Sequence, residues 1–147
     1  NDTNSIIIRT SWVYSSFGNN FVKIMRNLMA KNILLNVVDD QVGSPTYAAD
    51  LAETILTLIC YKKWIPGVYH YSNEGEVSWF DFANDIKYFF DFKTQLKRTS
   101  SEEYPTVAKR PKFSLLDKTK IKETYDIKVP YYKESLKKCI KILQNEE

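Results

Sequence analysis

Three consecutive isoleucines, Ile6 to Ile8, narrow the choice of fold more than any other feature of this chain. An uninterrupted run of β-branched residues suits a strand that is buried on both faces, as the strands of a parallel sheet are. Parallel neighbours have to be brought in by crossover connections of about a dozen residues or more. The few residues before Ile6 cannot supply such a connection. The run therefore predicts an α/β fold, and it suggests that the chain is a piece of a larger domain.

Hydrophobic periodicity predicts a mixed order of helices and strands after this first strand. Helices are expected over residues 21–31, 46–63, 79–90, 117–125 and 130–143, and strands over 33–38 and 68–72, with extended segments at 92–99 and 113–116. Ser78 and Asp81 have the spacing of a capping box. The expected core faces are Phe21, Ile24, Met25, Leu28 and Met29; Ala48, Leu51, Ala52, Ile55, Leu58 and Ile59; Trp79, Phe82, Ala83, Ile86, Phe89 and Phe90; and Tyr132, Leu136, Cys139, Ile140 and Leu143.

A turn-rich segment, residues 39–50 (DDQVGSPTYAAD), joins the strand at 33–38 to the second helix. Pro45 is compatible with a helix start, where a missing N–H is not needed. Ser44 or Thr46 can cap the free N–H groups there. The segment is therefore expected to be a strand-loop-helix junction with a fixed path.

Composition indicates one folded domain. The chain has 147 residues, of which 44% are hydrophobic and 27% charged, and this balance excludes a disordered protein. A net charge of +3 is too small to indicate nucleic acid. No signal peptide or apolar run of about 18 residues is visible, so a cytoplasmic protein without membrane contact is expected. Aromatic residues make up 14%, which fits an aromatic core or an aromatic-lined cleft.

Cysteine and histidine usage argues against metal binding. Cys60 and Cys139 both fall on expected apolar helix faces and are interpreted as buried free thiols in a reducing compartment. His70 is the only histidine, which excludes a site built from several histidines. The four glycines are scattered, and no glycine-rich nucleotide loop occurs. Composition and spacing alone lead no further than an α/β fold.

Five blocks of the sequence carry more information: IIIRTSWVYSSFGNNFV, DQVGSPTYAADLA, GVYHYSNEGEVSWFDFA, EEYPTVAKRPKFSLLD and PYYKESLKKCI. In order and approximate spacing these blocks resemble the dTDP-4-dehydrorhamnose reductases, members of the extended short-chain dehydrogenase/reductase (SDR) superfamily. The resemblance extends from about Ile6 to about Leu143. Because five separate blocks agree in order, it is specific.

The resemblance implies that the chain is the C-terminal portion of an extended SDR: the last Rossmann strands and helix together with the small α/β substrate-binding domain. Residues 1–31 would be a remnant of the NAD(P)-binding Rossmann domain. Residues 32–147 would be mostly substrate-binding domain, interleaved with Rossmann elements. The family's glycine-rich cofactor loop and its Thr/Tyr-x-x-x-Lys catalytic set precede the RTSWVY strand. No catalytic residue is therefore expected in this chain.

The implied activity is reduction of the 4-keto group of dTDP-6-deoxy-L-lyxo-4-hexulose to dTDP-L-rhamnose, a precursor of cell-surface polysaccharide. NADPH or NADH would be the cofactor of the whole enzyme, and some family members also use magnesium. Hydride transfer needs a bound cofactor and a proton donor. Since this chain encodes neither, it is predicted to be inactive alone. An uncovered sheet edge further suggests a homodimer.

The resemblance also implies site residues, each with a plainer alternative. Trp12 matches a tryptophan that packs against the sugar, and this role is favoured over the alternative of a core tryptophan at the end of a buried strand. Thr10 and Ser11 lie beside it, where the family lines the nicotinamide pocket. Gln41, Gly43 and Ser44 belong to a loop that flanks the substrate cleft. A helix start there could attract the diphosphate, or the loop could be a structural junction only.

Arg110 lies in the block YPTVAKRP, where extended SDR proteins commonly pair an arginine with the diphosphate of the nucleotide sugar. The planar guanidinium suits phosphate oxygens because it binds them bidentately. Tyr104 and Lys109 are further candidates in the same loop. The alternative is an ordinary exposed basic loop.

Two other functions compete with a reductase fragment. A non-catalytic regulatory subunit, like the β subunit of methionine adenosyltransferase, belongs to the same superfamily and keeps its fold. A stand-alone α/β interaction domain is the third possibility. The isolated first strand argues against it, because the strand's edges would be bare.

Overall fold

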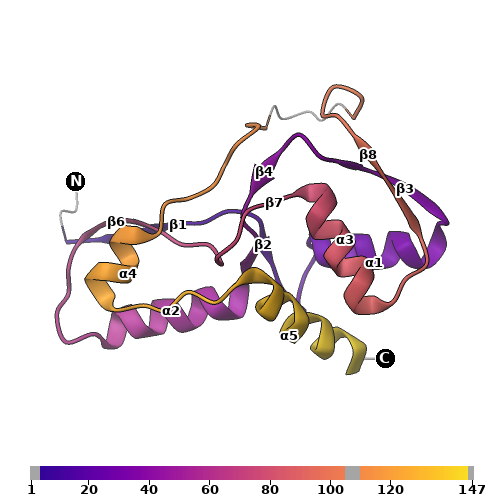
Figure 1. The fold of residues 1–147 in the computed structure, drawn as a ribbon. Helices are drawn as coiled ribbons and strands as arrows, with labels where there is room; N and C mark the ends of the chain where they lie inside the picture. Colours follow the sequence, from indigo (N-terminus) through magenta and orange to yellow (C-terminus); the bar gives the residue numbers. More distant parts are fainter. Residues whose placement is uncertain (1–3, 105–109, 146–147) are drawn as a thin grey trace.

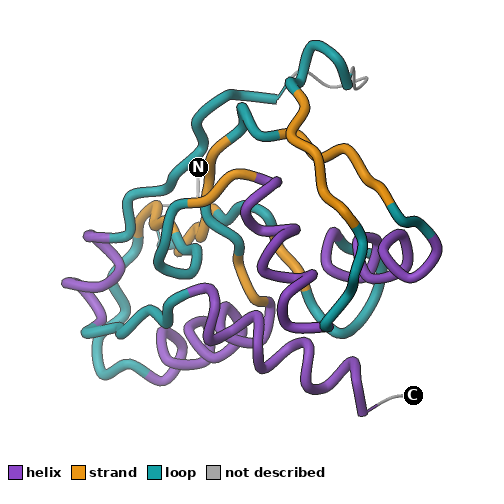
Figure 2. The backbone as a smooth tube through the Cα atoms, turned by 45° about the vertical axis from the view of Figure 1, so that its right-hand side comes forward, coloured by secondary structure: helices purple, strands orange, loops and turns teal. Residues whose placement is uncertain are grey.

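The computed structural model describes residues 4–104 and 110–145, in which short strands alternate with helices (Figures 1 and 2). The helices are α1 (Phe21–Lys31), α2 (Ala48–Cys60), α3 (Trp79–Phe90), α4 (Thr119–Tyr125) and α5 (Tyr132–Asn145). The strands are β1 (Ile6–Arg9), β2 (Val13–Tyr14), β3 (Leu34–Val38), β4 (Val42–Gly43), β5 (Thr46–Tyr47), β6 (Gly67–His70), β7 (Val77–Ser78) and β8 (Gln95–Thr99). The predicted α/β class is confirmed.

The strands of the described residues pair two by two. Three pairs are parallel, β1 with β6, β2 with β5 and β3 with β8, and the fourth, β4 with β7, is antiparallel. In Figure 1, β3 and β8 lie at the right with α1 and α3, while β1 and β6 lie at the left with α2 and α4. The short β2–β5 and β4–β7 ladders lie between the β3–β8 region and the β1–β6 region. Most of the predicted functional residues fall in this connecting region.

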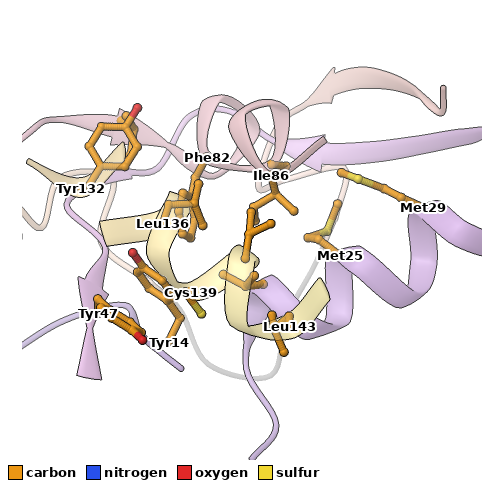
Figure 3. Packing of buried hydrophobic residues seen from close by; sticks show 14 of the residues in the cluster. Tyr14, Met25, Met29, Tyr47, Phe82, Ile86, Tyr132, Leu136, Cys139 and Leu143 are labelled. Atoms are coloured by element: carbon orange, nitrogen blue, oxygen red, sulfur yellow. The ribbon is translucent and has the colours of Figure 1, made fainter. Parts of the chain in front are cut away.

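The larger core lies between α1, α3 and α5 (Figure 3). Met25 of α1, Phe82 and Ile86 of α3, and Leu136 and Leu143 of α5 are all buried. The predicted inner face of the last helix is confirmed at every position. Burial of each large apolar side chain stabilises a fold by about 1.5–3 kcal/mol. This contact between three helices therefore holds one end of the molecule together.

The smaller core lies between α2, α4 and the β1–β6 ladder. Tyr69 of β6 meets Tyr125 of α4 edge to face, with ring centroids 5.4 Å apart. Both hydroxyls donate to the carbonyl of Ile65 at 2.9 Å. Leu58 of α2 and Ile121 of α4 complete the cluster. Each buried hydroxyl is thus satisfied by the chain segment that leads into β6.

The first strand is parallel as predicted, but it is not buried on both faces. β1 runs beside β6, with Ile7 opposite Val68. Ile6 and Ile8 face the smaller core, whereas Ile7 is 53% exposed. Since successive side chains of a strand alternate between faces, Ile7 and Val68 share the outer face of this ladder. No described residue covers that face well enough to bury Ile7.

The predicted inner faces of α1 and α2 are partly wrong. In α1 the buried residues are Val22, Met25 and Met29, while Ile24 and Leu28 remain about two-fifths exposed. The expected face therefore turns partly outward, toward the cleft described below.

The correction is larger for α2, where polar residues occupy the inner face. Asp50, Thr54 and Leu58 are buried, whereas Ile55 and Ile59 are exposed. Asp50 faces inward because it accepts hydrogen bonds from Asn73 and Ser135. Of the predicted apolar face, Leu58 is confirmed and Leu51 packs against the smaller core, whereas Ile55 and Ile59 point away from it. Cys60, at the end of the same helix, is exposed rather than buried, whereas Cys139 is buried as expected.

The junction at residues 39–50 is confirmed as a fixed connection, but its capping was predicted wrongly. Thr46 begins β5, and α2 starts only at Ala48, with Tyr47 at the N-cap and no side-chain capping bond. The Ser44 hydroxyl donates instead to the carbonyl of Asn73. The Thr46 hydroxyl donates to the carbonyl of Ser11 at 2.7 Å. Both hydroxyls are used to bind distant segments. The Ser78–Asp81 capping box of α3 is present as predicted.

Asn73 is the centre of a buried polar network. Its side-chain N–H groups donate to the Asp50 carboxylate at 2.6 Å and to the Ser135 hydroxyl at 3.1 Å. Its side-chain oxygen accepts from the backbone N–H of Tyr47 at 2.7 Å. Asn73 and Ser135 are fully buried. The network joins the start of α2, the segment after β6 and the first turn of α5.

We expect Asn73→Ala to lower the free energy of unfolding by about 3 kcal/mol, because the Asp50 carboxylate and the Tyr47 N–H would lose buried partners. Urea unfolding monitored by circular dichroism measures this. The control is Asn84→Ala, at an exposed position of α3, which should change stability little. Equal effects of the two substitutions would contradict the role given to the network.

Tyr71 provides a pH test of the packing. Burial raises the pKa of Tyr71 to about 12, although a hydrogen bond from Thr54 opposes the shift. In the unfolded chain the Tyr71 hydroxyl ionises near pH 10. The contribution of neutral Tyr71 to the free energy of unfolding is therefore complete below pH 10 and is lost as pH rises toward 12. Tyr71→Phe has no hydroxyl to ionise, so it escapes this loss. The difference in the free energy of unfolding between the unmodified chain and Tyr71→Phe should therefore shrink by roughly 1 kcal/mol between pH 9 and 11. Urea unfolding measures this, and Tyr88→Phe, at a position that is 78% exposed, is the matched control.

Candidate functional site

Two adjoining cavities open where the β4–β7 ladder meets the N-terminus of α3. The first, here called the tryptophan cavity, has a volume of about 360 Å³ and is lined by Ser11, Trp12, Gln41, Trp79, Arg110, Pro111 and Ser114. The second, the apolar cavity, measures about 240 Å³ and is lined by Phe21, Ile24, Met25, Leu28, Asn36, Val37, Val38, Gln41, Trp79, Tyr104 and Arg110. Gln41, Trp79 and Arg110 belong to both. These three residues therefore lie where the two cavities adjoin.

Trp12 is held in an unusual backbone conformation. It directly precedes β2 and has a φ of 50°, in the left-handed region that a bulky residue rarely adopts. Its carbonyl accepts from the backbone N–H of Thr46 at 3.1 Å. Its indole stacks on that of Trp79, with ring centroids 3.6 Å apart and planes within 10°. Contacts on both backbone and side chain therefore fix this residue at the cavity.

Gly43 leaves the room that Trp12 needs. A Cβ at Gly43 would lie 3.0 Å from two indole carbons of Trp12 and 2.7 Å from the Ser114 hydroxyl oxygen. Such distances are shorter than ordinary carbon contacts. Gly43 thus contributes through its missing side chain, as a wall against which Trp12 packs.

Trp79 is the residue of this site that the sequence prediction missed. The periodicity of α3 assigned it to the core, and it does pack against the larger core, but it is only half-buried and also borders both cavities. Its second neighbour is Phe21, whose ring centroid lies 4.5 Å away. The capping box was the signal in the sequence that could have indicated this position. It makes Ser78 the N-cap and so places Trp79 at the first position of the helix, at its end.

An ion pair fixes the start of α3 beneath this tryptophan. Ser78 donates its hydroxyl to Asp39 at 2.6 Å, and Arg98 donates to the other oxygen of Asp39 at 2.5 Å. Arg98 also lies 3.5 Å from Asp81 and 4.1 Å above the ring of Phe80. Partial burial acts to raise the pKa of Asp39, but the bonds from Ser78 and Arg98 outweigh it and hold that pKa below its usual range. Asp39 therefore remains an anion at neutral pH.

The structure brings together most of the residues proposed for the substrate. Trp12, Gln41 and Arg110 line one cavity although they come from three distant segments. Tyr104, which is 58% exposed, lines the apolar cavity beside Arg110. Among residues 4–104 and 110–145, no carboxylate pairs with the Arg110 guanidinium. Its charge is thus available to an anion.

The hydroxyl groups of the other predicted residues are engaged within the protein. Ser44 is fully buried and binds the Asn73 carbonyl, so it supports the loop from behind. Lys109 lies outside the described residues. Thr10 donates to the Thr46 hydroxyl at 3.2 Å, and Ser11, which does border the tryptophan cavity, donates to the Ser44 carbonyl at 3.3 Å.

The described residues do not form a cofactor or metal site by themselves. Thr10 and Ser11, proposed for the nicotinamide, have their hydroxyls engaged within the protein. No glycine-rich turn cradles phosphates beside them. Within the part of the chain that the structure describes, no three His, Cys, Asp or Glu side chains are grouped to hold a metal ion, so the magnesium allowed by the resemblance has no site here. None of the helices described is long and apolar enough to cross a bilayer.

Comparison with known proteins shows to which family the chain belongs. The family model named "RmlD substrate binding domain" matches residues 1–145. The chain belongs to this family. It is 40% identical over 146 residues to the dTDP-4-dehydrorhamnose reductase of Sinorhizobium fredii, covering 93% of this chain and 49% of that protein.

Two solved structures extend the agreement of this RmlD-family chain to its fold. A dTDP-4-dehydrorhamnose reductase from Bacillus anthracis, in complex with NADP, has a TM-score of 0.88 and 39% identity, covering 93% of this chain and 48% of its own. One from Clostridium acetobutylicum has a TM-score of 0.87 and 42% identity, covering 95% and 49%. The predicted resemblance is confirmed. The chain spans about half the length of these relatives.

Proposed function

We propose that this chain is the nucleotide-sugar-binding part of a dTDP-4-dehydrorhamnose reductase. The whole enzyme would reduce dTDP-6-deoxy-L-lyxo-4-hexulose to dTDP-L-rhamnose with NADPH or NADH. The observation that carries the proposal is the meeting of Trp12, Gln41 and Arg110 in one cavity. An aromatic face, an amide and a guanidinium that no carboxylate of the described residues pairs with are groups that suit a sugar diphosphate.

Each group has a role that its chemistry supports. The Trp12 indole offers an apolar surface to the C–H groups of a hexose and an N–H to its hydroxyls. Arg110 binds the diphosphate, since its planar fork matches phosphate oxygens. It borders both cavities, so a diphosphate beside it would lie between two binding regions. The apolar cavity, with the amides of Asn36 and Gln41 among its lining residues, would then hold the nucleobase.

The nicotinamide cofactor would be bound mainly by another part of the protein. The related Bacillus anthracis enzyme is in complex with NADP and is about twice as long as this chain. When bound, the cofactor supplies the hydride, and the protein has to orient the keto sugar and provide a proton. The residues of this chain hold and orient the nucleotide sugar. No Tyr-x-x-x-Lys sequence occurs in it to supply the proton.

The outer surface of the β1–β6 ladder supports packing against such a part. Ile7 and Val68 lie opposite each other on its exposed face, 53% and 39% exposed. A parallel ladder of only two strands is unusual, because parallel sheets are normally covered on both faces. A Rossmann-type layer would bury these side chains. A second copy of the chain is the other candidate for this surface, as a homodimer.

We expect the chain to bind dTDP, and Arg110→Ala to weaken this binding about 10- to 100-fold because a charge-assisted contact to phosphate is lost. Isothermal titration calorimetry with dTDP measures the affinity. Lys112→Ala is the matched control, since it removes the same charge from a neighbouring side chain that lines neither cavity. Equal affinities for the two variants would remove Arg110 from the site.

We also expect no reductase activity from the 147-residue chain alone. Oxidation of NADPH, followed by its absorbance in the presence of the dTDP-keto sugar, should not exceed the rate without protein. Addition of the remaining half of a related reductase would provide the positive control. Turnover by the chain alone would show that it holds a proton donor and cofactor site of its own.

A further inference from the structure

Trp79 lies at the boundary between the two cavities. It is one of the three residues that border both of them, and the only aromatic one among these three. One neighbour is the Trp12 indole at 3.6 Å, almost parallel to it. Another is Phe21, at 4.5 Å and inclined by 48°. Trp79 therefore separates the tryptophan cavity from the apolar cavity and supports the residue that faces the sugar.

The conformation of Trp12 depends on this support. A left-handed backbone at a bulky residue costs of order 1–3 kcal/mol and persists only where the surroundings determine it. Three contacts do so here: the Trp79 stack, the close approach of Gly43, and the bond from the Thr46 N–H to the Trp12 carbonyl. Two of these contacts, the stack and the approach of Gly43, act on the indole, and the Thr46 bond acts on the backbone. Loss of Trp79 would remove one of the two surfaces that hold the ring.

Trp79 is in turn fixed from behind by charged residues outside both cavities. Arg98 on β8 holds Asp39 at the end of β3, and Asp39 accepts from Ser78, the residue before Trp79. Arg98 also stacks on Phe80, the residue after it. The residues on both sides of Trp79 are thus tied to one guanidinium. The β3–β8 ladder sets the position of the first turn of α3 in this way.

We propose that Trp79 is a positioning and specificity-determining residue for the sugar part of the ligand, acting through Trp12, and that Arg98 positions Trp79. This inference rests on the proposed function, in which the tryptophan cavity takes the sugar. It distinguishes Trp79 from Arg110, which contacts the diphosphate directly. Removal of Trp79 should therefore weaken recognition of the sugar while leaving recognition of dTDP largely intact.

The first test compares dTDP with dTDP-L-rhamnose by calorimetry. In the unmodified chain the sugar should increase the affinity. Aromatic stacking is worth a factor of about 3 to 10, so Trp79→Leu should reduce this increase by that factor, with little change for dTDP. Trp79→Phe, which keeps an aromatic face, should restore part of it. Arg98→Ala should reduce the increase in affinity that the sugar gives by a smaller factor, although Arg98 lines neither cavity.

The second test needs no ligand. Two stacked indoles couple their electronic transitions, which gives a pair of oppositely signed bands in the circular dichroism spectrum. The chain has three tryptophans, and Trp64 is half-exposed with its indole N–H bound to the Asn4 carbonyl. The bands should persist in Trp64→Phe and disappear in both Trp12→Phe and Trp79→Phe. Thermal unfolding of each variant verifies that it is folded.

Several results would overturn the proposal. Equal losses for dTDP and dTDP-L-rhamnose in folded Trp79→Leu would give Trp79 a general structural role. Persistence of the coupled bands in Trp79→Phe would exclude the stack. If Trp79→Leu fails to fold, Trp79→Phe and Arg98→Ala decide the question by the same ligand comparison. Failure of the unmodified chain to bind either ligand would overturn the proposed function as well. This outcome can be told apart from equal losses in Trp79→Leu, which would overturn only the role of Trp79.

Discussion

The side chain of Asn73 is the interaction on which the rest of the structure depends. It binds Asp50 at the start of α2, Ser135 in the first turn of α5 and the backbone of Tyr47 in β5. Each partner is buried, so none can exchange its bond for one with water. A buried carboxylate is tolerated only when hydrogen-bond donors surround it. Asn73 and Ser135 supply those donors, and the elements that carry them must therefore meet at this point.

The cleft is a consequence of the same junction. Ser44 binds the Asn73 carbonyl and Thr46 binds the segment that contains Trp12, so the loop between β3 and α2 is tied at its inner end. Its outer end presents Gln41 to the cavity, and Gly43 packs against the Trp12 ring. One short segment thus links the structural network to the candidate binding site. Trp12 can hold a left-handed conformation because this segment fixes its carbonyl while Trp79 fixes its ring.

The network also explains which surfaces of the described chain remain apolar and exposed. Because Asp50 turns the polar side of α2 inward, Leu56 and Ile59 lie outside, each 62% exposed. Ile7 is exposed on the outer face of the β1–β6 ladder, and Ile24 and Leu28 border the apolar cavity. Their surroundings differ. Ile24 and Leu28 line the apolar cavity, whereas Ile7 lies on the open face of a two-stranded ladder.

The sequence by itself determined the class of fold, the approximate extent of the long helices, the inner face of α5 and the capping box of α3. These features depend on local periodicity and on hydrogen bonds between near neighbours, which a sequence displays directly. Its resemblance to the reductases also named Trp12, Gln41 and Arg110, which the structure brings into one cavity.

Only the tertiary structure decided which face of α2 is buried, where Ser44 points and that Trp79 belongs to the site. In α2 the apolar residues predicted one inner face, and the bonds of Asp50 selected another. Trp79 fits a core stripe by its spacing, yet the stack with a residue 67 positions earlier places it at the cavity. Such outcomes depend on partners far apart in the chain. Local periodicity contains no information about them, because they form only when separate segments are packed together.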